Sequence, residues 1–231
     1  MEPLYLDNHL LAVAKPPGVL TQADRTGDLD LVSLAKAYLK QRFGKPGNVF
    51  VGLVHRLDRP TSGVVMLART SKAASRLSDQ FRRRAVQKRY LAVLDGVLSA
   101  PETWTERADG LVREGGGVRV VPAGEEGSQQ ARLRWRTLET DAGRSLVEVD
   151  LLTGRKHQIR AQVAAAGAPV LGDFRYSRRA VPFAGGRGIA LHAFRLQVEH
   201  PTRREPVSVT APPPGAWAGL FEDAVARTVA R

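Results

Sequence analysis

The chain has 231 residues and a mass of 25.1 kDa, enough to bury a full core as one large domain or two small lobes. Its 35 lysines and arginines outnumber its 23 aspartates and glutamates, and the resulting net charge of +12 predicts a polyanionic partner. Cysteine is absent, which excludes a disulfide framework, a thiolate metal site and a cysteine nucleophile.

The opening sequence, MEPLYLDNHL, has no basic segment ahead of an apolar one, so it does not resemble a signal peptide. No apolar run approaches the roughly 18 residues that span a bilayer. We therefore expect a cytoplasmic protein with no membrane association, and we treat residues 1–231 as a single domain.

Two elements are predicted near the start of the chain. Residues 9–14 predict a short strand, and the sequence KPPG at 15–18 predicts a rigid turn with a solvated lysine, because successive prolines cannot donate to a sheet. The apolar spacing over residues 31–38 predicts a helix that Gly44 closes.

Asp58 lies in the sequence HRLDRPTSG, with an arginine on each side. Residues 49–54 predict a buried strand and residues 64–68 a second one, and Pro60 and Gly63 interrupt regular structure between them. This pattern places Asp58 on a loop between two core strands, where catalytic groups are frequent and where arginines favour the ionised carboxylate. The plainer interpretation is an exposed aspartate in a charged turn.

Residues 70–86 predict an amphipathic helix with Thr70 or Ser71 as its N-cap, and residues 88–94 predict a strand. Seven basic residues and one acidic residue lie between positions 71 and 89, a net charge of +6. Such a run forms either a solvated face or a phosphate-contacting face. The side opposite the apolar stripe carries Lys72, Arg76 and Arg83.

The middle of the chain changes character twice. Residues 99–130 lack hydrophobic periodicity and predict loops or a short hairpin. Alternating apolar residues then predict two half-buried antiparallel strands, around 133–137 and 147–151. A helix is predicted from Ile159 to a stop at Gly167, with Arg160 in its first turns.

The last third predicts strands at 188–199 and 206–211. Seven arginines and one glutamate between positions 175 and 204 give a second net charge of +6, and we expect the two basic runs to form opposite walls of one cleft. Strands outnumber helices and follow one another through hairpins. The predicted class is therefore α+β with a large, mostly antiparallel sheet.

Motifs of several other enzyme classes are missing. Ser62 does not lie in G-x-S-x-G, and no P-loop or dinucleotide-binding fingerprint follows a predicted strand. The five histidines include no H-E-x-x-H pair, so we expect no metal site. One carboxylate in an arginine-rich setting, Asp58, remains as the candidate for chemistry.

Four stretches of this chain, taken together and in order, resemble the RNA pseudouridine synthases of the RluA type. The central one is HRLDRPTSG followed by VVMLA, and the others are LLAVAKPPG near the start, KRYLAV in the middle and TGRKHQIR later. Gly172-Asp173 and Leu191-His192-Ala193 also match. The resemblance extends over roughly residues 5–211.

The resemblance implies an α+β fold in which a bent, mixed, mostly antiparallel sheet forms two lobes with flanking helices around a basic central cleft. It implies isomerisation of uridine in structured RNA, ribosomal or transfer, without a cofactor. We expect a monomer. Because the first motif ends at Gly18, we expect no N-terminal S4-like module.

By the same resemblance, Asp58 is the essential carboxylate, Tyr90 stacks on the flipped base and Arg160 pairs with Asp58. Arg56 fills the position that the base vacates. Three of these roles have an ordinary alternative: a core aromatic for Tyr90, a surface cation for Arg56 and an ordinary phosphate contact for Arg160. The expected RNA-binding residues are His55, Arg56, Lys72, Arg76, Arg83, Arg155 and Lys156.

Two other functions are open. The first is a catalytically silent RNA-binding protein or chaperone on the same scaffold, which the presence of Asp58 disfavours. The second is a hydrolase in which Asp58 works with Asp95, Asp150 or Asp173, although the sequence places none of these beside it. Departures from the family pattern, such as Lys156 in place of a small hydroxyl residue, concern RNA specificity more than chemistry.

Overall fold

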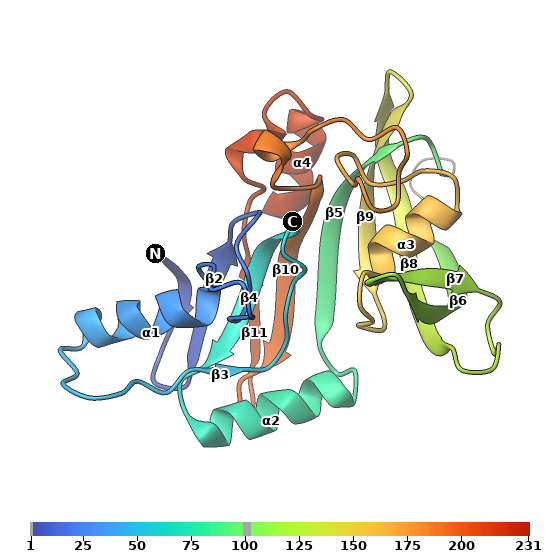
Figure 1. The fold of residues 1–231 in the computed structure, drawn as a ribbon. Coiled ribbons are helices and arrows are strands. Elements are labelled where there is room, and N and C mark those ends of the chain that lie inside the picture. The colour runs from blue at the N-terminus through green and yellow to red at the C-terminus, as the bar shows by residue number, and fades with distance from the viewer. Residues whose placement is uncertain (1, 99–102) are drawn as a thin grey trace.

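The computed structural model describes residues 2–98 and 103–231, which fold around one mixed sheet of eleven strands (Figure 1). The strand order is β1-β2-β4-β10-β5-β9-β8-β6-β7, with β11 added to β10 and β3 to β4. Its strands are β1 Pro3–Leu6, β2 Leu10–Lys15, β3 Gly52–Leu53, β4 Ser62–Ala68, β5 Gln87–Asp95, β6 Thr105–Glu114, β7 Gly117–Val121, β8 Gln129–Asp141, β9 Arg144–Leu151, β10 Leu191–Glu199 and β11 Pro206–Thr210.

One parallel pair, β4 with β10, joins strands that are otherwise antiparallel among the described residues, which confirms the predicted class. At this junction Ser62 pairs with His192 and Gly63 with Ala193. Gly63 has φ of +128°, and a Cβ there would lie 2.4 Å from the carbonyl oxygen of Ala193. Gly63 therefore permits the close approach of β4 to β10, instead of ending regular structure as predicted.

Helices cover both faces of the sheet near β4, which explains why this strand is buried throughout. Val65 and Leu67 pack in the cluster that includes α1, Leu31–Arg42, and α4, Glu222–Ala230. Val64 and Met66 pack in the cluster that includes α2, Ser71–Arg82. The period of two along a strand thus separates two apolar layers. None of the helices in the described ranges has the length and apolar character that a membrane span requires.

Several predicted boundaries change in the structure. The expected strand at 49–54 shrinks to β3, because Phe50 is exposed and only Gly52 and Leu53 pair with a neighbouring strand. The helix α2 has the expected N-cap Thr70, whose side chain accepts from the amide of Ala73, but it ends at Arg82. Neither β1 nor α4 is among the predicted elements.

The second half of the sheet carries larger differences. Strands β8 and β9 pair as predicted, but β9 is buried on both faces from Ser145 to Leu151 and is not half-buried. The region from 105 to 121, expected as loops or a short hairpin, is a hairpin of the two paired strands β6 and β7, while residues 99–102 lie outside the described part. The helix α3, Gln158–Ala165, packs on this hairpin through Ala161.

Candidate active site

A cavity of about 560 Å³ lies beside Asp58, where the loop before β4 meets β5 and the start of α3. The loop contributes His55, Arg56 and Thr61, and β5 contributes Lys88 and Tyr90. The opposite side is formed by the end of β9, by the loop from Thr153 to His157 and by α3. The wall is thus assembled from segments separated by about a hundred residues in the chain, and it contains residues of HRLDRPTSG, KRYLAV and TGRKHQIR but none of LLAVAKPPG.

Hydrogen bonds to the backbone hold the loop on both sides of Asp58. The hydroxyl of Thr21 donates to the carbonyl of Leu57 at 2.8 Å and accepts from the amide of the same residue at 3.3 Å. The amide of Thr61 donates to the carbonyl of Asp58 at 3.0 Å and closes a turn. Asp58 therefore projects from a fixed backbone, and its side chain retains 28% exposure towards the cavity.

Lys15 is buried, with 1% of its surface exposed, so the predicted solvated lysine is wrong. Its Nζ donates to the carbonyl oxygens of Val19 at 2.8 Å, Arg59 at 3.0 Å and Pro16 at 3.1 Å. Burial lowers the pKa of Lys15 to about 7, and the negative charge of Asp58 acts in the opposite direction. The chain turns back after Lys15, so that carbonyls of this turn and of the Asp58 loop surround the ammonium group. Strand and turn patterns in the sequence do not reveal this arrangement.

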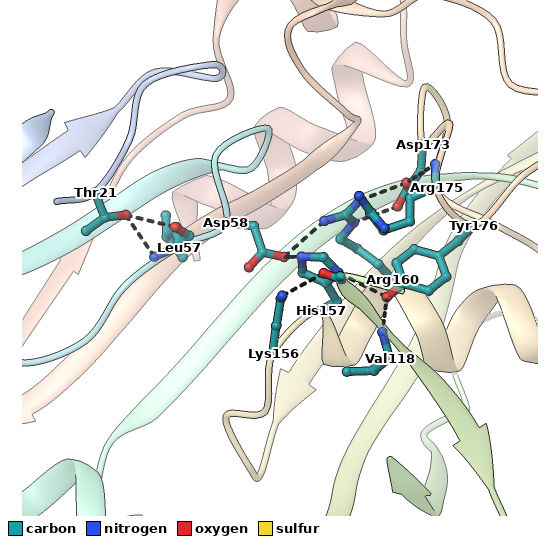
Figure 2. A network of polar contacts seen from close by, with 11 residues as sticks. Thr21, Leu57, Asp58, Val118, Lys156, His157, Arg160, Asp173, Arg175 and Tyr176 are labelled. Carbon is teal, nitrogen blue, oxygen red and sulfur yellow. Dashed lines mark hydrogen bonds and ion pairs between the residues drawn. The ribbon is translucent and has the colours of Figure 1, made fainter. Parts of the chain in front are cut away.

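Arg160 joins two carboxylates. Its Nε and Nη2 donate to the two oxygens of Asp173 at 2.7 and 2.9 Å, and its Nη1 donates to Oδ2 of Asp58 at 3.3 Å (Figure 2). Arg160 and Asp173 are both buried, so the bidentate pair fixes the guanidinium and leaves one nitrogen for Asp58. The expected contact between Arg160 and Asp58 is present, but the stronger partner, Asp173, is absent from the expected set of active-site residues.

Tyr90 and His55 form part of the apolar wall near Asp58. Burial and the neighbouring Asp58 carboxylate both raise the pKa of Tyr90, so its phenol stays neutral. His55 accepts from the amide of Met66 at 2.9 Å and stacks on Phe81 with ring centroids 4.7 Å apart. Burial lowers the pKa of His55 to about 3, with Lys88 acting in the same direction. His55 is thus a neutral ring that anchors the loop to β4, and its contact with RNA stays a prediction.

The predicted RNA-binding residues divide into two groups. His55, Arg56 and Arg155 line the cavity, whereas Lys72, Arg76, Arg83 and Lys156 are not among its lining residues. Arg76 donates to the carbonyl of Pro201 and Arg83 to Asp79, while Lys156 donates to the carbonyl of Gly116. These three side chains thus contact other groups of the protein. A position on the surface is therefore not enough to predict that a cation binds phosphate.

Three other cations line the cavity in their place, namely Arg82, Arg84 and Lys88. Because α2 ends at Arg82, the following residues leave the helical direction, and Arg84 has φ of +59°. Arg82 is the last residue of α2 and Lys88 lies in β5, so Arg84 is the one of the three whose position depends on where the helix ends.

The second basic run does not form the opposite wall. Within the described chain, no arginine from 175 to 204 lines this cavity, and Arg195 instead lines a hollow with Arg89 and Trp104. The two-carboxylate hydrolase also lacks a partner for Asp58. Asp150 pairs with Arg134 at 2.8 Å, Asp95 pairs with Arg144 at 3.2 Å, and Asp173 is occupied by Arg160.

His157 and Tyr176 complete the surroundings of Asp58 and are not among the predicted site residues. Nε2 of His157 lies 3.9 Å from Oδ2 of Asp58, and Nδ1 lies 3.0 Å from the Tyr176 hydroxyl (Figure 2). His157 has φ of +52° and ψ of +19°, a left-handed conformation that sequence periodicity does not signal. Its position inside the motif TGRKHQIR was the one available indication.

The site can hold one ionised carboxylate at the mouth of a partly apolar cavity, beside a neutral tyrosine and several cations. A fixed guanidinium orients the carboxylate, and the cavity admits a planar ring next to it. The described residues contain no group of three histidines, cysteines or carboxylates placed to hold a metal ion. The arrangement suits chemistry by a single carboxylate on a ligand that carries phosphates.

Comparison with known proteins gives consistent matches. A family model described as RNA pseudouridylate synthase matches residues 9–165. Ribosomal large subunit pseudouridine synthase C of Haemophilus ducreyi is 31% identical over 220 residues, which cover 90% of this chain and 64% of that protein. The tRNA pseudouridine synthase C of Salmonella typhi is 33% identical over 241 residues, covering 94% and 87%. The chain thus spans less than two thirds of the length of its ribosomal relative.

Two solved human structures share the fold. Human RNA Pseudouridylate Synthase Domain Containing 4 superposes with a TM-score of 0.76 at 23% identity, over 99% of this chain and 92% of that one. Human RNA Pseudouridylate Synthase Domain Containing 1 gives a TM-score of 0.66 at 29% identity, over 91% and 82%. The arrangement of strands and helices described above is therefore the fold of these proteins.

Proposed function

The chain belongs to the RNA pseudouridylate synthase family, and on that premise we propose that it isomerises specific uridines in structured RNA to pseudouridine, with Asp58 as the essential carboxylate. The observation that carries this proposal is the position of Asp58 at the cavity, with its Oδ2 held by an arginine that Asp173 fixes. A catalytically silent binding protein has no need for a carboxylate so placed, since it repels phosphate.

The reaction conserves every atom of the nucleotide. The bond between N1 of uracil and C1′ breaks, the base rotates, and a bond from C5 to C1′ forms. The C5 proton leaves and N1 gains a proton, so no electron carrier or net hydrolysis is needed. Asp58 contributes a carboxylate beside the reacting nucleoside, whether it attacks C1′, adds to the ring or removes a sugar proton.

Access to these atoms requires the uridine to leave the stack, which costs a few kcal/mol. Tyr90 offers a neutral aromatic surface in the cavity, and the exposed Arg56 is available to fill the vacated position. Arg82, Arg84 and Arg155 extend the cationic rim on which the flanking phosphates bind. Flipping and binding thus use separate residues around one carboxylate.

The substrate is a structured RNA, either ribosomal or transfer, since named relatives act on each. We propose that the chain acts as a single catalytic domain and as a monomer in the cytoplasm. The sheet supports one unit, because it is continuous from β1 to β7 and the cavity draws residues from both halves.

The proposal is tested by mapping pseudouridines in total RNA from cells with and without the protein. We expect one or a few sites to disappear without it and to return with the wild-type protein but not with Asp58→Asn. An unchanged map would contradict the proposal. Restoration of the lost sites by Asp58→Asn would favour a binding or chaperone role that recruits another enzyme.

A further inference from the structure

Three groups form a chain that ends at the Asp58 carboxylate. The amide of Val118 in β7 donates to the hydroxyl oxygen of Tyr176 at 3.0 Å, and this hydroxyl lies 3.0 Å from Nδ1 of His157 (Figure 2). Nε2, on the other side of the imidazole ring, faces Oδ2 of Asp58 at 3.9 Å. The chain therefore connects the backbone of the β6–β7 hairpin to the candidate catalytic group.

The donors and acceptors in this chain favour one position of the imidazole proton. A backbone N–H only donates, so the Tyr176 oxygen accepts from Val118. The hydroxyl proton then finds an acceptor in Nδ1 of His157, the other polar atom in contact with it. A neutral imidazole with Nδ1 as acceptor carries its proton on Nε2. That proton points towards Asp58.

The charges around His157 favour the neutral ring. Burial lowers the pKa of His157 to about 4; the Asp58 carboxylate acts against this shift, and the cations Arg160, Lys156 and Arg175 act with it. Tyr176 is neutral, because burial raises the pKa of its phenol. The ring is therefore a hydrogen-bond donor through Nε2 and not a second positive charge.

The backbone of His157 is held in an uncommon conformation. A left-handed residue other than glycine costs about 1–2 kcal/mol, and here it occurs directly before α3 without any side-chain cap. Strain of this kind persists where the surroundings demand it, frequently at functional sites. The conformation turns the ring away from the helix and towards Asp58, as Figure 2 shows.

We propose that His157 is a positioning residue whose Nε2–H, set by Tyr176, orients the Asp58 carboxylate together with Arg160. Both groups approach the same oxygen, Oδ2, and no polar contact to Oδ1 is found among the described residues. Two donors on Oδ2 leave Oδ1 to face the nucleotide. This inference rests on the proposed function, because it assigns Asp58 as the reacting group.

The distance of 3.9 Å exceeds the usual range of about 2.7–3.2 Å for an N–H···O hydrogen bond. A small rotation of the carboxylate closes the gap, and catalytic hydrogen bonds commonly tighten only in the complex with substrate. The Arg160 guanidinium cannot move closer to Asp58, since Asp173 holds two of its nitrogens. His157 is then the contact that forms when RNA binds.

The first test reads the tautomer directly. Nitrogen-15 NMR of the full chain without RNA reports which imidazole nitrogen of His157 is protonated, and we expect Nε2. Tyr176→Phe removes the donor to Nδ1, so the proton should shift to Nδ1 in a large fraction of molecules. Tyr5→Phe, a hydroxyl remote from the site, is the control and should leave the signals unchanged. A wild-type ring protonated on Nδ1 would overturn the proposal.

The second test reads turnover. At saturating protein, Tyr176→Phe and His157→Asn should each lower the single-turnover rate of pseudouridine formation about tenfold, with RNA affinity unchanged. Asparagine tolerates the left-handed backbone, so His157→Asn keeps the fold. Wild-type rates in both variants would overturn the positioning role. A wild-type protein with the Nε2 proton and no activity on any RNA would instead contradict the proposed function.

Discussion

The ammonium group of Lys15 lies 3.0 Å from the carbonyl oxygen of Arg59, the residue that follows Asp58. The same nitrogen donates to the carbonyls of Pro16 and Val19, so three N–H groups meet three acceptors in a buried position. A further contact, from the amide of Gly18 to the carbonyl of Arg59 at 2.9 Å, joins the same two segments. The end of β2 and the Asp58 loop therefore form one structural unit.

Replacement of this lysine should destabilise that unit. Lys15→Met keeps the length of the side chain but removes the donor to the carbonyls of Pro16 and Val19 and one of the two donors to the carbonyl of Arg59. We expect a loss of about 2–4 kcal/mol in the free energy of unfolding. Urea denaturation measures the loss. The control is Lys72→Met, at an exposed helix position, which should stay within about 0.5 kcal/mol of the wild type. Equal midpoints for both variants would contradict a structural role for Lys15.

The bidentate pair of Arg160 with Asp173 predicts a loss of rate and not of affinity. Arg160→Lys keeps the charge but cannot bind Asp173 through two nitrogens and reach Asp58 with a third. We expect the single-turnover rate to fall about 100-fold, a loss typical of a removed electrostatic contact, while the dissociation constant for RNA changes less than threefold. A variant with weakened binding and a wild-type rate at saturation would make Arg160 an ordinary phosphate contact.

Two adjacent arginines provide a matched test of the basic rim. Arg84 lines the cavity, whereas Arg83 pairs with Asp79 at 2.6 Å outside it. Arg84→Gln should reduce the slope of log affinity against log salt concentration by about 0.7–0.9, the value for one phosphate contact. Arg83→Gln should leave the slope unchanged. The reverse result would restore the helix face carrying Lys72 and Arg76 as the RNA-binding surface.

The N-terminal hairpin has an acid-sensitive anchor. Burial raises the pKa of Asp7, but the amides of His9 and Leu10 and the side chains of His200 and Tyr5 donate to its carboxylate and outweigh burial, so its pKa falls from 3.8 to about 2. The folded state thus prefers the ionised carboxylate. Its stabilising contribution is complete above about pH 4 and is lost as the pH falls towards 2.

Asp7→Asn should accordingly destabilise the protein at pH 7, and the difference from the wild type should shrink below pH 4. Thermal unfolding of both proteins between pH 2 and 7 gives the comparison. A difference that is the same at every pH would show that the packing of the side chain, and not its charge, is responsible.

Sequence patterns predicted the parts of the site that depend on local order along the chain. The loop position of Asp58, the helix that carries Arg160 and the strand that carries Tyr90 all follow from periodicity and turn residues. The contact of Arg160 with Asp58 followed from family resemblance, since nothing local joins residues 102 positions apart.

The features of the site that the sequence did not predict are the positions of single side chains at the ends of regular elements. The sequence suggests that Lys15 is a surface residue because two prolines follow it, yet its ammonium group donates to carbonyls of two different loops. The orientation of Arg84 depends on the end of α2, and that of His157 on a left-handed backbone. Helical and strand periods carry little information on such positions, because Lys15 is the last residue of β2 and the other two lie just outside the regular elements.

The central claim is that the Asp58 carboxylate is needed to replace the N1–C1′ bond of uridine by a C5–C1′ bond. The C5 hydrogen leaves when this exchange takes place, so its release measures the reaction. RNA labelled with tritium at C5 of uracil should release its label to water in step with pseudouridine formation when mixed with wild-type protein in EDTA. Asp58→Asn should bind the same RNA with nearly unchanged affinity and release less than a few per cent of the label. Release by Asp58→Asn at a rate comparable to the wild type, or a wild-type rate that depends on added metal, would contradict the account.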